Sequence, residues 1–144
     1  LDSHDTDLQS EILAHEPMVI IPSGLKKLKW SEGQPLSVIS IEDYSGAWRS
    51  FGELVSKLGI KREVALESFF SVAQMGVAGF GHALVPIGVA RALGIDDKLL
   101  ISLGRHGLMR PVRFVARKST YSLPVVSNFF LALKAHLQTA EWLG

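Results

Sequence analysis

Two stretches of this chain place small polar residues where a strand gives way to a helix. Ser45 and Gly46 follow a predicted strand over 36–41, and Ser68 follows a shorter one over 64–66. The first backbone N–H groups of a helix have no intrahelical acceptor, and the helix dipole makes that end positive. Such helix starts bind a carboxylate or another anion, but a side-chain cap alone also satisfies them. The residues therefore leave ligand contact and simple capping as open alternatives.

Histidine is the other residue type with potential chemistry. His82 lies at a predicted turn between a helix and a strand, where it faces either a ligand or only neighbouring protein groups; the pattern favours the second. No two histidines are four residues apart, the spacing of a metal-binding pair on one helix face. The five histidines are His4, His15, His82, His106 and His136.

Residues 1–11 carry several acidic groups and His4, but we expect them to form a frayed terminus, which does not hold converging metal ligands. No paired carboxylates and no Ser/His/Asp set stand out in the rest of the chain. We therefore expect no metal, no cofactor and no catalytic residues.

Three glycines, Gly76, Gly79 and Gly81, invite comparison with a dinucleotide-binding loop. That fingerprint has the order G-x-G-x-x-G and lies between a strand and a helix. Here the order is G-x-x-G-x-G, and the glycines follow a helix and precede a strand. They therefore indicate a tight helix-to-strand connection and not a phosphate site.

The hydrophobic pattern predicts strands that alternate with helices. Such alternation is typical of βαβ units, so we expect an α/β fold with a largely parallel open sheet and flanking helices. Strands are predicted over 18–21, 36–41, 64–66, 83–85, 99–103 and 112–116; helices over 48–58, 68–77 and from 86 to about 93, with a last helix capped by Ser122 and carrying Pro124 in its first turn.

Composition excludes several classes of protein. The 144 residues are 47% hydrophobic and 20% charged, as expected of one globular domain. Fifteen basic and fourteen acidic residues give a net charge of +1, which argues against a dedicated nucleic-acid surface. Cysteine is absent, and no apolar run approaches the roughly 18 residues of a membrane span. No secretory signal is visible. The first residue is Leu1 and not methionine, so we expect a fragment of a longer protein.

Three motifs resemble the effector-binding domain of LysR-type transcriptional regulators. They are E-P-M-V-I-I-P at 16–22, S-I-E-D-Y at 40–44 and V-A-G-F-G-H-A-L-V-P at 77–86, of which the last is the most specific. The segment 110–117 and the helix after Ser122 are similar to the family's closing strand and helix. The resemblance runs from about residue 8 to residue 137.

The resemblance implies a fold like that of periplasmic binding proteins. Residues 22–107 would form the second lobe, and residues 1–21 and 108–144 would belong to the first lobe, part of which is absent. A small effector, which we expect to be anionic, would bind between the lobes and modulate transcription. DNA would be bound only through a domain absent from this chain, and the full-length protein would be a cytoplasmic homo-oligomer without membrane contact or enzymatic activity. A solute-binding domain serving transport is one alternative, and a small α/β enzyme is another.

Carried over position by position, the resemblance also implies which residues contact the effector. The cleft wall includes Ser45, Gly46, Ala47, Ser68 and Phe69, and the wall or the hinge includes His82 and Pro86.

Overall fold

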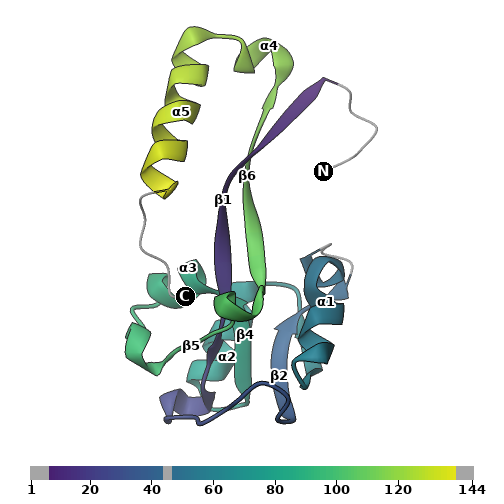
Figure 1. Cartoon of the computed structure of the whole chain (residues 1–144). Coiled ribbons are helices and arrows are strands. Elements are labelled where there is room, and N and C mark those ends of the chain that lie inside the picture. The colour runs from purple at the N-terminus through teal and green to yellow at the C-terminus, as the bar shows by residue number, and fades with distance from the viewer. Residues whose placement is uncertain (1–6, 44–46, 139–144) are drawn as a thin grey trace. The chain divides into compact units, whose positions relative to one another are not determined.

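The computed structural model describes residues 7–43 and 47–138 (Figure 1). The strands are β1 (Leu8–Ile21), β2 (Leu36–Ile41), β3 (Ile60–Leu66), β4 (His82–Pro86), β5 (Ile101–Ser102) and β6 (Met109–Arg117). The α-helices are α1 (Ala47–Lys57), α2 (Phe69–Val77), α3 (Ile87–Ala92), α4 (Lys118–Tyr121) and α5 (Pro124–Gln138), and short 3-10 turns are η1 (Ser23–Leu25), η3 (Asp97–Leu99) and η4 (Gly104–His106).

The chain forms two compact units. Unit 2 contains Glu16–Arg110, and the described residues 7–15 and 111–138 belong to unit 1. Strands β1 and β6 pair with each other, and both pass from one unit to the other (Figure 1).

Unit 2 is built on an open sheet with the strand order β3-β2-β4-β1-β5. Strand β2 is parallel to both β3 and β4, but β1 is antiparallel to β4 and to β5. The prediction of an open α/β sheet with flanking helices is confirmed, whereas a largely parallel sheet is wrong, because β1 enters the sheet from the opposite direction. No hydrophobic pattern reveals strand direction, since a buried strand looks the same either way.

Alternating residues of the central strands supply two hydrophobic cores. In β1, Val19 and Ile21 join the core covered by α2 and α3, while Met18 and Ile20 join the core covered by α1. This period of two is what a strand buried on both faces requires. Helices therefore cover both faces of the sheet, and their starts are fixed by the strands that precede them.

Several elements differ in length from their predictions. Strand β1 begins at Leu8, so residues 8–11 are not a frayed terminus, and β3 begins at Ile60, directly after the glycine that ends α1. Strand β6 is longer than predicted, and β5 is reduced to Ile101–Ser102 because residues 97–99 form a 3-10 turn.

Unit 1 contains α5, which buries Phe130 against Phe114 and Tyr121 at centroid distances of 5.4 and 5.5 Å. Pro124 is the first residue of this helix, as predicted. The predicted cap is wrong: Ser122 ends α4, and its hydroxyl donates to the carbonyl of Ser119. Ser122 is instead the C-cap of the short helix α4, which lies directly before α5.

The glycine-rich connection joins α2 to β4, as predicted. Gly79 has a φ of +89°, a backbone conformation that residues other than glycine rarely adopt. A Cβ on Gly76 would lie 2.7 Å from the Cβ of Ala83, so this glycine allows α2 to approach β4 closely. Gly76 and Gly79 therefore shape the connection between α2 and β4, as the sequence predicts, and do not form a phosphate-binding loop.

Candidate functional site

Three helices of unit 2 start where the parallel strands end. Helix α1 follows β2, α2 follows β3, and α3 follows β4 directly. Because the three strands are parallel, their carboxyl ends lie along one edge of the sheet, which we call the carboxyl edge. In open α/β sheets, this is the edge at which ligands bind.

The start of α2 combines a cap with an aromatic ring. The N–H of Phe70 donates to the hydroxyl of Ser68 at 3.1 Å, so Ser68 caps the helix as predicted. Phe69 is half-buried and packs against both cores. The first turn carries no acidic residue, so the positive end of this helix has no charged side chain of its own to neutralise it.

An ion pair that joins distant parts of the chain lies at the start of α3. Arg110 Nη2 donates to Glu16 Oε1 at 2.9 Å, and the N–H of Gly88 donates to Glu16 Oε2 at 2.7 Å. Glu16 is only 4% exposed, whereas the side chain of Arg110 is 38% exposed. The guanidinium carbon also lies 5.8 Å from the ring centroid of Phe69. Arg110 therefore connects the start of α3 with the start of α2.

A second arginine organises the end of β2. Arg62 donates to the carbonyl of Ile41 and pairs with Asp43. Its guanidinium carbon lies 4.2 Å from the centroid of Trp48, a favourable cation–π position. The carboxyl edge thus carries two arginines, each held against an aromatic ring and a carboxylate.

The structure brings only some of the predicted effector contacts together. Ser68 and Phe69 lie at the carboxyl edge, and Pro86 is buried there as the residue before α3. Ala47 is the first residue of α1. Ser45 and Gly46 lie outside the described residues.

His82 lies at the other end of the sheet from the carboxyl edge, because it is the first residue of β4. Its Nδ1 accepts the N–H of Ser23 at 2.9 Å, so the side chain holds the turn that follows β1. The partner of His82 is therefore a backbone group of the protein and not a ligand. This is the alternative that the sequence pattern favours.

The sequence pattern does not single out Glu16, Arg62 or Arg110 as site residues. Glu16 and Arg110 are 94 positions apart, and no local signal reveals that a carboxylate so close to a hydrophobic strand is buried. The available signal is the residue type itself, since a glutamate two residues before the apolar run 18–21 requires a partner if it is buried.

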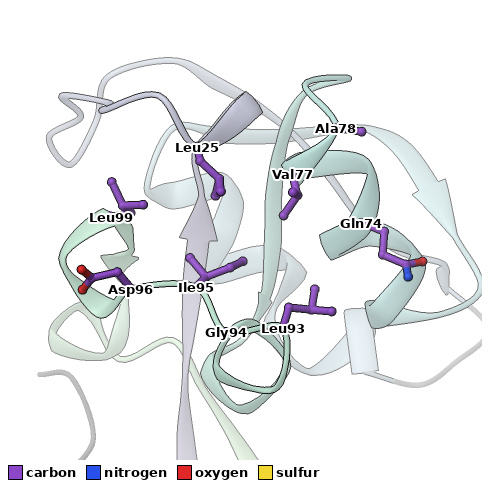
Figure 2. Close-up of a pocket in the computed structure, with 9 residues that line it drawn as sticks. All are labelled: Leu25, Gln74, Val77, Ala78, Leu93, Gly94, Ile95, Asp96 and Leu99. Atoms are coloured by element: carbon purple, nitrogen blue, oxygen red, sulfur yellow. The ribbon is translucent and has the colours of Figure 1, made fainter.

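Unit 2 also has an apolar cavity of about 490 Å³, shown in Figure 2. Its polar side chains are Gln74 and Asp96, and Asp96 already accepts the N–H of Lys98. The cavity lies at the ends of α2 and α3 and not at their starts. It contains none of the predicted contacts and no cation, so we favour the carboxyl edge as the ligand site. The lining residues are Leu25, Gln74, Val77, Ala78, Leu93, Gly94, Ile95, Asp96 and Leu99.

Within residues 7–43 and 47–138, no three His, Asp or Glu side chains are grouped closely enough to hold a metal ion. In the same part of the chain, every helix is too short or too polar to cross a bilayer.

The open sheet with helices on both faces defines an α/β domain of the periplasmic-binding-protein kind. Residues 1–138 match the family described as LysR substrate binding domain, and the chain belongs to this family. The predicted membership is thereby confirmed. Membership of this family identifies the chain as an effector domain of a transcriptional regulator, and it favours this function over solute transport. No curated protein sequence matches the chain.

Solved regulatory domains share the fold. The reduced form of the OxyR2 regulatory domain from Vibrio vulnificus is 21% identical, with a TM-score of 0.58, and the match covers 95% of this chain and 68% of that one. The CcmR regulatory domain from Synechocystis PCC6803, in complex with 2-PG, is 15% identical with a TM-score of 0.62, covering 96% and 71%. The bromide-bound HypT domain from Salmonella typhimurium is 18% identical with a TM-score of 0.59, covering 94% and 68%. This chain spans about two thirds of such domains.

Proposed function

We propose that the carboxyl edge of unit 2 is one wall of the effector site, and that the effector is a small anionic metabolite. The observation that supports this most is the convergence of helix starts with two arginines on one edge. The positive end of α2 and a guanidinium both favour negative charge. Ser45, Gly46, Ala47, Ser68, Phe69 and Pro86 belong to the proposed wall, whereas His82 holds the turn at the opposite end of the sheet and is not part of it.

The proposed mechanism is a shift between conformations of the regulator. An effector changes that equilibrium only by its difference in affinity for the two states. DNA is bound by a domain outside this chain, the complete regulator is a cytoplasmic homo-oligomer, and the domain catalyses no reaction. Residues 22–107 act as the second lobe, and the remaining segments contribute to the first.

Isothermal titration with small anions tests this proposal. Suitable probes cover inorganic, aliphatic and aromatic anions. They are sulfate, acetate, citrate, benzoate and 2-PG, the molecule in the CcmR complex. We expect at least one to bind, and we expect Ser68→Ala to weaken its binding by removing a polar group at the wall and loosening the start of α2.

Asp96→Ala is the matched control. It also removes a helix cap, since Asp96 accepts the N–H of Lys98, but it lies at the apolar cavity and not at the carboxyl edge. Binding that is insensitive to Ser68→Ala and sensitive to Asp96→Ala would place the ligand in the cavity and contradict the proposed site.

A further inference from the structure

The guanidinium of Arg110 has more hydrogen-bond donors than the surrounding protein uses. Of its five N–H donors, Nη2 reaches Glu16. Its Nε is buried and has no hydrogen-bond partner among the described residues. Buried polar groups in folded proteins are almost always paired, so an unpaired one indicates a missing partner or a conformation that changes on binding.

Glu16 gives the guanidinium one hydrogen bond, through Oε1, and its second oxygen meets a different donor. That oxygen accepts the N–H of Gly88 at 2.7 Å, and a Cβ at position 88 would lie only 2.6 Å from it. The glycine therefore admits the carboxylate to the start of α3, and the carboxylate stays there instead of forming a two-bond pair with the arginine. The buried Nε therefore lacks an acceptor in the described part of the chain, and the solvent-exposed edge of the guanidinium remains available to one.

The available edge lies where the proposed function needs a cation. Arg110 is 38% exposed, and its guanidinium lies beside Phe69, the first residue of α2. A planar guanidinium matches the two oxygens of a carboxylate, and helix starts attract the same group. An aromatic surface next to the cation also lets the uncharged part of a ligand pack there.

We propose that Arg110 binds the anionic group of the effector, and that this group is a carboxylate or a similar oxyanion. The inference rests on the proposed function and narrows it to one residue and one ligand chemistry. Arg62, the other arginine of the carboxyl edge, is 16% exposed and is already occupied by Ile41, Asp43 and Trp48.

Pairs of a carboxylate and its amide test the role of Arg110, because the two molecules have nearly the same shape but differ in charge. Benzoate with benzamide and acetate with acetamide are titrated against the intact chain, together with sulfate and phosphate. We expect a carboxylate to bind at least about tenfold more tightly than its amide. Arg110→Gln should then weaken the carboxylate by roughly ten- to hundredfold and leave the amide nearly unchanged, since only the anion uses the charged hydrogen bonds.

Arg91→Gln is the matched control. Arg91 is 35% exposed and pairs with Asp97 at 3.0 Å, so its replacement removes an arginine of similar exposure, with its ion pair, away from the carboxyl edge. It should not change the preference for the anion. If Arg110→Gln fails to fold, as judged by circular dichroism, Arg110→Lys keeps the charge but loses the planar fork, and we expect a loss of several-fold.

The possible outcomes separate this inference from the proposed function. Unchanged carboxylate binding in a folded Arg110 variant overturns the role of Arg110 but leaves effector sensing intact. Equal binding of amide and carboxylate overturns the anionic ligand class. If no probe binds, charged or neutral, both the inference and the proposed site are contradicted.

Discussion

At the scale of single residues, the carboxyl edge depends on a glycine that the sequence gives no reason to notice. Gly88 lies in the first turn of a helix, where alanine would normally be preferred. The structure explains the glycine, because a buried carboxylate occupies the space of its missing side chain. The position of Glu16, and through it that of Arg110, is therefore set by the absence of one methyl group.

Gly88→Ala should destabilise the protein. Alanine gains about 1 kcal/mol of helix propensity, but it displaces a buried carboxylate from its N–H partner, which costs about 1–3 kcal/mol for each polar group left unpaired. Two groups are affected, the Glu16 carboxylate and the Gly88 N–H, so we expect a net loss of about 1–5 kcal/mol in the free energy of unfolding, measured by urea denaturation.

A double-mutant cycle with Glu16→Ala identifies the cause. Without the carboxylate, the new methyl group has space, so Gly88→Ala should cost much less in the Glu16→Ala background. An equal cost in both backgrounds would mean that the contact with Glu16 is not responsible.

How far the sequence predicts the site also depends on individual residues. Ser68 was predicted from a local pattern, a serine between a strand and an apolar helix, and it caps α2. Ser122 shows the same pattern but ends another helix, because a capping signal does not reveal that a short helix already lies between the strand and the longer helix. Glu16 and Arg110 meet only through the fold, so no local pattern connects them. The predicted contacts at Ser45 and Gly46 remain predictions.

At the scale of elements, the turn between α1 and β3 determines where the outer strand of the sheet begins. Gly59 has a φ of +87°, and a Cβ there would lie 2.9 Å from the carbonyl oxygen of Gln34. The N–H of Leu36 in turn donates to the carbonyl of Gly59 at 3.0 Å. The glycine thus lets the chain reverse directly into a strand that pairs with β2.

Gly59→Ala should cost more than Gly94→Ala, although both replace a glycine of positive φ. Gly94 has a φ of +73° and nothing within 4 Å of the added Cβ, so only the backbone penalty of about 1 kcal/mol applies. At Gly59, overpacking against backbone atoms adds about 1–3 kcal/mol. Thermal or urea denaturation of both variants measures the difference, and equal costs would show that the turn relaxes to admit the methyl group.

At the scale of the whole molecule, the buried hydrophobic residues are divided unevenly. Among the described residues of unit 1, Leu13 and Phe130 are the buried hydrophobic ones, and the remaining buried hydrophobic side chains belong to unit 2. Helix α5 instead exposes Val125 at 74%, Phe129 at 59% and Leu131 at 59%. This chain also spans only about two thirds of the related regulatory domains. Unit 2, with the candidate site, therefore has the core of an independent domain, whereas unit 1 does not.

Hydrogen exchange should show this division directly. Local stability follows the density of buried contacts, so amides of α5 should exchange faster than those of β2 and β4 by at least about tenfold. Phe130→Ala should accelerate exchange in α5 further, because Phe130 is 5% exposed and its loss removes the buried ring that packs against Phe114 and Tyr121. Phe129→Ala is the control: it is the adjacent residue of the same type, but it is 59% exposed and should have little effect. Neither variant should change exchange in β2 and β4. If Phe130→Ala accelerated exchange equally in both units, the chain would unfold as one cooperative block, and the candidate site would depend on unit 1 for its stability.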